Sequence, residues 1–272
     1  SVATPTRTAT PIVTPTPTST GQISTDAEVA CARVNYHRTW AGVPLLQLNN
    51  SLIKAAEAHS HYMVINGMSH YEDPSKSGYT GEWAWDRAQS FGFPTGNVWE
   101  GVGAKSFMDT IQSCIDEQVS GPLHRYPLLH SGLLLFGFGV ETYYTVCYGN
   151  LSWTEAQAVV YPGENQTEVP ILFRGGESPD PYPSAQYPVG YAVSLFGPAS
   201  KTMTINNYYL KPVGGSNLSL VTFLPSNSYG YTYIFSMSSV DPLSSGTTYE
   251  AHIDAIIGGS NFNRTWQFTT KN

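Results

Sequence analysis

Residues 50–70 read Asn-Ser-Leu-Ile-Lys-Ala-Ala-Glu-Ala-His-Ser-His-Tyr-Met-Val-Ile-Asn-Gly-Met-Ser-His, and this stretch decides the fold of the first half of the chain. Five side chains recur at the spacing of one helix face: Leu52, Ala55, Ala56, His59 and Met63. Gly67 follows the last periodic residue, as the cap of a helix C-terminus commonly does. The stretch therefore predicts an amphipathic helix from about Asn50 to Asn66, ending shortly before His70.

Three more helices and a few strands surround this segment. The same periodicity predicts helices over Asp26–Trp40, Thr80–Ser90 and Phe107–Val119. Between and after them, β-branched and aromatic residues with interspersed glycines predict strands over Val98–Ala104 and within Leu134–Tyr148. Because helices and a small number of strands alternate, we expect an α/β/α sandwich domain with a small sheet.

From about Pro162 the helical patterning disappears, and Pro, Gly, Tyr, Ser and Thr dominate. Short candidate strands then follow one another, separated by turn-rich stretches: Tyr191–Leu195, Met203–Leu210, Tyr231–Met237, Thr248–Ile256 and Thr265–Thr270. This spacing predicts an all-β sandwich that loosely resembles bacterial Ig-like accessory domains, so the fold class of the whole chain is α+β. The predicted boundaries are a tether over 1–23, the α/β/α domain over 24–163, a linker or opening loop over 164–185 and the β-sandwich over 186–272.

Composition limits the possible partners and predicts where the protein works. Charged residues make up 12 % of the 272 residues and the formal net charge is −7, so no basic face is available for nucleic acid. No apolar run approaches the length of a membrane span. Ser1–Gly21 is a Thr/Pro-rich, semi-extended tether, which predicts an extracellular or cell-surface location.

Three cysteines are too few for a disulfide scaffold. They allow one bridge at most, and if one forms we favour Cys31 with Cys147. Cys114 lies within an apolar-periodic helix, which indicates a reduced and buried side chain.

Histidines and carboxylates of the first domain lie in four informative segments: Asn66–His70, Val98–Gly103, Ile111–Glu117 and Gly121–Leu129. The order of Asn35 and Arg38 in the first helix, Gly67-Met-Ser-His70 after the second, and Asp86-Arg87 before Gly92 resembles the CAP (SCP/PR-1-like; cysteine-rich secretory protein, antigen 5 and PR-1) superfamily, bacterial type. The resemblance covers about residues 24–163.

The resemblance implies a central cavity lined by two histidines and two glutamates, which fall on His70, Glu100, His124 and Glu117. His70 closes the Ser-His segment, Glu100 takes the place of the glutamate in the family's Gly-Glu-Asn, and His124 precedes Arg125 as in Gly-His-Arg. Trp99 and Gly101 depart from the family at the Glu100 motif, and Glu117 is placed by its nearness to His124. Such a set holds a divalent cation, Zn, Mg or Ca, or forms a hydrogen-bonded polar cluster without one.

The leading hypothesis is a CAP-domain protein that binds a divalent cation or small ligand in this cavity, with an Ig-like accessory module and no assigned catalytic residue. The alternatives are a metal-dependent extracellular hydrolase or peptidase, with Glu100 or Glu117 as general base, and a structural adhesion or matrix protein. The expected partner is a small molecule, lipid, peptide or cell-wall glycan.

Overall fold

A computed structural model describes residues 25–105, 110–150 and 157–272. The predicted tether lies outside the described residues. The first half is built on a four-stranded sheet with the strand order β1-β3-β4-β2. Its strands are β1 (Gln47–Leu48), β2 (Val98–Ala104), β3 (Leu135–Val140) and β4 (Tyr143–Gly149).

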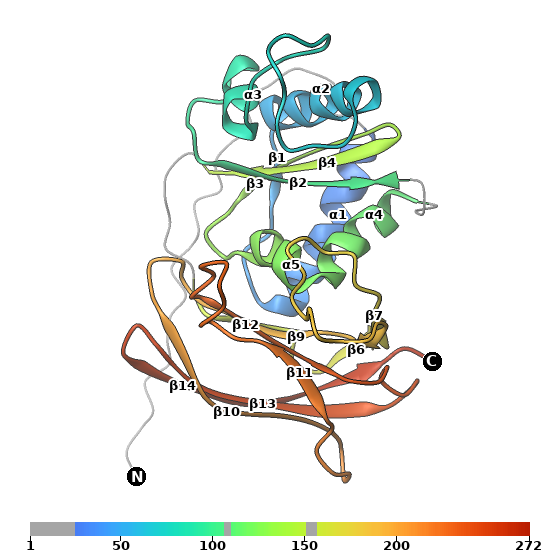
Figure 1. The fold of residues 1–272 in the computed structure, drawn as a ribbon, viewed down its shortest axis with the longest axis vertical. Helices are drawn as coiled ribbons and strands as arrows, with labels where there is room; N and C mark the ends of the chain where they lie inside the picture. The colour runs from blue at the N-terminus through green and yellow to red at the C-terminus, as the bar shows by residue number, and fades with distance from the viewer. Residues whose placement is uncertain (1–24, 106–109, 151–156) are drawn as a thin grey trace, which may run out of the picture.

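Helices cover both faces of this sheet, which confirms the three-layer α/β/α prediction (Figure 1). The helices are α1 (Thr25–Ala41), α2 (Asn50–Asn66), α3 (Ala84–Ser90), α4 (Ile111–Ser120) and α5 (Pro122–Leu129). Helix α2, with α3 beside it, packs on one face, and α1, α4 and α5 lie on the other. Gly137 and Gly139 of β3 let α2 approach closely, because a Cβ at either position would collide with the backbone of α2.

The predicted helix boundaries are accurate for α1 and α2 and less so for the others. The third helix was predicted from Thr80, but α3 begins only at Ala84, because Thr80 and Gly81 donate their backbone N–H groups to the Glu72 carboxylate. Thr110 caps α4 by accepting a hydrogen bond from the Ser113 N–H. Helix α5 was not predicted as a separate element.

The second half is β-rich. One four-stranded sheet has the order β10-β13-β14-β6, a second has the order β11-β12-β9-β5, and β7 pairs with β8. Their bounds are β5 (Val159–Tyr161), β6 (Gln166–Val169), β7 (Leu172–Phe173), β8 (Val189–Gly190), β9 (Val193–Phe196), β10 (Met203–Pro212), β11 (Leu220–Phe223), β12 (Ile234–Ser239), β13 (Thr248–Ile257) and β14 (Ser260–Thr270). Strands β5, β6 and β7 precede the predicted sandwich boundary at residue 186, yet β5 and β6 pair with its sheets.

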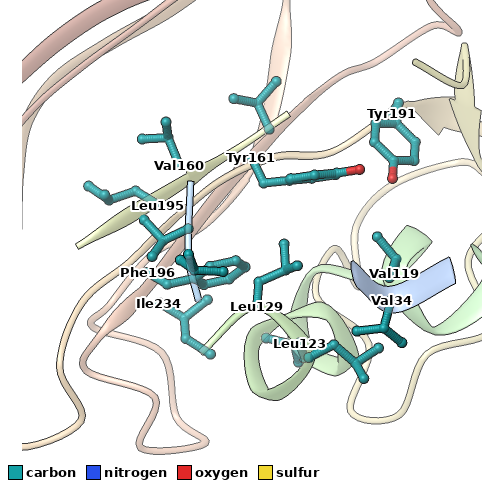
Figure 2. Packing of buried hydrophobic residues seen from close by; sticks show 14 of the residues in the cluster. Val34, Val119, Leu123, Leu129, Val160, Tyr161, Tyr191, Leu195, Phe196 and Ile234 are labelled. Carbon is teal, nitrogen blue, oxygen red and sulfur yellow. The ribbon is translucent and has the colours of Figure 1, made fainter. Parts of the chain in front are cut away.

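The two halves share one continuous apolar core. Figure 2 shows Leu123 and Leu129 of α5 beside Ile234 and Phe196, which belong to the second half. Arg125, fully buried, donates hydrogen bonds from α5 to the Ala192 carbonyl at 2.7 Å and to Ser194 Oγ at 2.9 Å. The two halves are therefore in fixed contact, while their independent folding stays a prediction.

All three cysteines are free and buried, so the favoured Cys31–Cys147 bridge is not formed. The sheet explains this result. Cys31 belongs to the apolar cluster that contains α1, whereas Cys147 of β4 belongs to the cluster beneath α2. Cys114 is buried as predicted, and burial raises the pKa of its thiol to about 11.

Candidate functional site

A cavity of about 300 Å³ lies between the two halves of the molecule. Both halves line it, with residues from the loop after α2, β2, α5 and the loop that follows it, β4, the loop between β7 and β8, the loop after β9 and the start of β12 with the residues before it. They are His70, Trp99, Glu100, Leu123, His124, Tyr126, Pro127, His130, Leu133, Tyr148, Ser178, Pro179, Ala199, Tyr231, Tyr233 and Ile234. The structure thus brings His70, Glu100 and His124 to one cavity, and Glu117 is not among its lining residues.

The first polar group of the cavity is the pair His70–Glu100. Nδ1 of His70 lies 3.0 Å from Glu100 Oε1. The Glu100 side chain on β2 is only 3 % exposed, while the imidazole of His70, in the loop after α2, is 48 % exposed. Burial favours the neutral carboxyl, but the hydrogen bond from His70 and the charge of Arg87 outweigh it, so the pKa of Glu100 is lowered. Glu100 is therefore a carboxylate that holds an accessible imidazole.

Arg87 of α3 supports Glu100 from the protein interior. Its guanidinium donates to Glu100 Oε1 at 2.7 Å and lies 3.8 Å from Glu72 Oε1. His59 joins the same buried network, since its Nδ1 lies 2.7 Å from Glu72 Oε1 and its Nε2 lies 2.8 Å from the Ser69 carbonyl. His59 is thus a satisfied core residue, and Arg87 is the buried cation that balances two carboxylates.

The second polar group is the pair His124–Glu177. Glu177 Oε1 lies 2.8 Å from His124 Nδ1 and also accepts the backbone N–H of His124 at 2.5 Å, so one carboxylate orients the ring and caps α5. Gly121 makes room for it, because a Cβ there would lie 2.6 Å from Glu177 Oε1. Burial lowers the pKa of His124, but the hydrogen bond and charge of Glu177, helped by Glu117, outweigh burial and raise it.

Sequence reasoning missed Glu177 and proposed Glu117 in its place. Glu117 is exposed at the end of α4 and accepts hydrogen bonds from the Tyr144 hydroxyl and the Gln118 amide. Its charge acts on His124 from outside the cavity lining. Glu177 lies 53 residues beyond His124, in a segment predicted as a linker, and no local pattern there indicates a site. The neighbouring Gly175-Gly176 indicates only a turn, since both glycines have a positive φ.

The arrangement does not fit a single metal ion. Among residues 25–105, 110–150 and 157–272, no group of three or more His, Cys, Asp or Glu side chains is close enough to hold one. In addition, the Arg87 guanidinium already neutralises Glu100, and a cation there would meet that charge. The donors instead form two imidazole–carboxylate pairs.

The walls of the cavity are aromatic and come from both halves. Tyr126 of α5 lies 5.0 Å from Tyr233 between ring centroids, and Tyr233 lies 6.2 Å from Tyr231. The Tyr126 ring also contacts His130 edge-on at 5.4 Å. The cavity therefore combines tilted and edge-on aromatic rings with the imidazoles of His70, His124 and His130, a surface suited to an organic ligand.

The fold and the site define a class of protein. It has a three-layer α/β/α domain whose His70, Glu100 and His124 line a cavity, and a β-rich module forms the other wall of that cavity. Residues 31–157 match the model of the cysteine-rich secretory protein family (CAP), and this part of the chain belongs to that family. Among curated proteins, no sequence matches the chain.

Two solved structures are similar in part. One is an extracellular protein containing an SCP domain from Bacillus anthracis, at 21 % identity and a TM-score of 0.40, covering 46 % of this chain and 40 % of that one. The other is an outer surface protein from Borrelia burgdorferi, at 12 % identity and a TM-score of 0.36, covering 46 % of this chain and 92 % of that one. The family assignment rests on the match of residues 31–157.

Proposed function

We propose that this protein binds a small organic ligand in the cavity between its CAP domain and its β-rich module. The observation that carries the proposal is that His70 and His124 line one cavity, each held through Nδ1 by a buried carboxylate. This leaves the Nε2 atoms as the free hydrogen-bonding positions of two oriented imidazoles. Preorganised polar groups inside an aromatic cavity are typical of ligand-binding sites.

The lining favours a ligand with an apolar body and one polar group. Apolar contact comes from Leu123, Leu133 and Ile234, and flat ring surfaces come from Tyr126 and Tyr233. Both cavity carboxylates already have partners, since Glu100 pairs with His70 and Arg87 and Glu177 pairs with His124. A ligand that donates or accepts a hydrogen bond at an imidazole, and buries rings or chains against the walls, fits best.

The fluorescent amphiphile 8-anilinonaphthalene-1-sulfonate (ANS) tests this site. We expect the native protein to bind it with enhanced fluorescence, and Ala199→Trp, which places a large side chain at the cavity wall, to abolish binding. Ser200→Trp, at the neighbouring exposed residue that does not line the cavity, is the control and should bind normally. Equal ANS binding by all three proteins would rule the cavity out as the site.

We propose further that the β-rich module is Ig-like. The support is the strand order: β5-β9-β12-β11 and β10-β13-β14 match the ABED and CFG sheets of that fold when strands are taken in chain order. Tyr249, near the start of β13, accepts a hydrogen bond from the backbone of Ser244 five residues upstream, in the manner of a tyrosine corner.

An extracellular or cell-surface location is part of the same proposal, supported by the Thr/Pro-rich segment Ser1–Gly21 and by membership of residues 31–157 in the secretory protein family. Among the described residues, no helix is both long and apolar enough to cross a membrane.

The alternative function for the cavity is the binding of a divalent cation. It requires the imidazoles and carboxylates to leave the pairs described above, because the pairs as arranged do not form a three-donor group. Elemental analysis of protein purified without chelators separates the readings. Under our proposal Zn, Mg and Ca are each well below one ion per chain, and one tightly bound ion that is lost in both His70→Ala and His124→Ala would overturn it.

A further inference from the structure

We propose that Tyr71, Trp83 and Trp85, here called the aromatic platform, form a second binding site that takes a neutral polysaccharide. The platform belongs to the CAP domain, and none of its three residues lines the cavity. The proposal goes beyond the cavity ligand and is independent of it.

The rings of the platform pack on one another at the surface. Trp83 and Trp85 are stacked with ring centroids 5.7 Å apart and an interplanar angle of 18°. Tyr71 meets Trp83 edge-on at 5.8 Å. Each of the three side chains nevertheless stays about 40 % exposed: Tyr71 40 %, Trp83 39 % and Trp85 41 %.

This exposure is concentrated in one part of the chain. Half of the large apolar side chains that are exposed among the described residues lie within residues 64–99. Scattered exposed apolar residues are ordinary, but large aromatic rings that gather on one surface mark a binding surface.

Buried charges hold the platform in place. Glu72 is fully buried, accepts the backbone N–H groups of Thr80 and Gly81, and donates its own backbone N–H to the Glu82 carbonyl. This pairing holds Tyr71 next to Trp83. Arg87 then fixes the Gly81 and Glu82 carbonyls through hydrogen bonds of 3.2 and 3.1 Å.

The base of the platform is also rigid at α3. The backbone N–H of Trp83 donates to Asp86 Oδ2 at 3.0 Å, which closes the first turn of the helix on which Trp85 lies. A rigid aromatic surface loses little conformational entropy when a ligand binds.

The charges around the rings favour a sugar chain as the occupant. Burial, together with the nearby charges of Glu82 and Asp73, raises the pKa of the Tyr71 hydroxyl, so both carboxylates lie close to the rings. Carboxylates accept hydrogen bonds from sugar hydroxyls, and the negative faces of aromatic rings attract the polarised C–H groups of a pyranose ring. The same carboxylates repel the phosphates of nucleic acid and of anionic lipid. A neutral polysaccharide therefore fits both the rings and their surroundings.

Native affinity electrophoresis tests this site with three neutral polysaccharides in the gel: hydroxyethylcellulose, xylan and glycol chitin. We expect at least one of them to retard the full-length protein. Trp85→Ala should weaken that interaction by about tenfold or more, because a lost aromatic contact of about 1.4 kcal/mol corresponds to that factor. Tyr229→Ala, which removes an exposed ring of the β-rich module that does not line the cavity, is the control and should be retarded like the native protein.

Two further measurements keep the outcome decisive. Circular dichroism and thermal unfolding establish that each variant is folded, and Tyr71→Ala replaces Trp85→Ala if that variant does not fold. Ala199→Trp should lose ANS binding at the cavity but keep its retardation, which separates this site from the proposed function. The proposal is overturned if none of the three polysaccharides retards the native protein, if the platform variants are retarded equally, or if phosphatidylcholine vesicles bind in their place.

Discussion

Glu177 accepts two hydrogen bonds from His124, one from the backbone N–H at 2.5 Å and one from Nδ1 of the ring at 2.8 Å, although 53 residues separate the two. The contact joins the segment before the β-rich module to helix α5 of the CAP domain. It also fixes the orientation of one of the two imidazoles in the cavity. The β-rich module thus follows a segment that completes the site of the first domain.

Glu177→Gln should lower the pKa of His124, because the charge that raises it is removed. His124 has a folded-state pKa above its ordinary 6.5, so its contribution to stability is complete below that pH and is lost as the pH rises through the folded pKa. The stability advantage of the native protein over the variant should therefore shrink as the pH rises from 6.5 through the raised folded-state pKa of His124. NMR titration of the His124 ring and urea unfolding measure the two effects. Glu164→Gln, in an exposed pair with Arg264, is the control, and an unchanged His124 titration in Glu177→Gln would contradict the contact.

Arg87→Met should strongly destabilise the CAP domain. The substitution leaves the buried carboxylates of Glu72 and Glu100 without their cation, and removing one partner of a buried ion pair costs about 3–5 kcal/mol. Urea unfolding measures the loss. Arg264→Met removes an exposed pair and should cost about 1 kcal/mol or less. If the two variants lose equally little free energy of unfolding, the buried network of Arg87, Glu72 and Glu100 does not stabilise the CAP domain.

His130 should make the protein acid-sensitive. Burial, with the charge of Arg38 as a second cause, lowers the pKa of His130 from 6.5 to about 4. Between these two pH values the His130 imidazole is protonated in the unfolded chain but not in the folded chain. The free energy of unfolding should therefore fall by about 3 kcal/mol as the pH drops from 6.5 through 4. His130→Asn should flatten this part of the pH profile, since the amide does not titrate, and His61→Asn at an exposed position of α2 should leave it unchanged. Equal acid sensitivity in His130→Asn and the native protein would mean that other groups cause it.

The three cysteines should react only after unfolding. Cys31 and Cys114 are buried with pKa values raised to about 11, and Cys147 is also buried, so few thiolates form and reagents do not reach them. We expect no alkylation of the native protein and three labels per chain in denaturant without a reducing agent. A single label under those conditions would reveal a disulfide.

Arg125→Met should loosen the contact between the two halves. The fully buried guanidinium donates to the carbonyls of Val119 in α4 and of Ala192 just before β9, and these carbonyls would be left unpaired at a cost of about 1–3 kcal/mol each. Limited proteolysis should then cut the connector within residues 161–183 faster than in the native protein, with Arg264→Met, which lies outside the connector in an exposed pair, as the control. The predicted independence of residues 24–163 and 186–272 gains support if both fragments remain folded after that cut. Cleavage at the native rate in Arg125→Met would count against the role of Arg125.

The sequence by itself determined the elements whose signals are local. The 3.6-residue period and Gly67 define α2, and the glycines of β3 mark where α2 lies against the sheet. The resemblance to the CAP family also predicted that His70, Glu100 and His124 share a cavity, and the structure places all three in the lining of one. Helix α3 was predicted too long, since the hydrogen bonds that hold residues 80 and 81 out of it come from Glu72, a residue earlier in the chain.

Only the tertiary structure decided which carboxylate holds His124. Glu117 is seven residues away in sequence, but it lies outside the cavity lining and bonds to Tyr144. Glu177 is distant in sequence, and the packing of the β-rich module against α5 brings it to the helix N-terminus, where Gly121 leaves room. The cysteines follow the same logic, since the sheet separates Cys31 from Cys147. Periodicity and motifs report contacts along one element, whereas a side chain's partner from another element depends on how the layers pack, which no local pattern encodes.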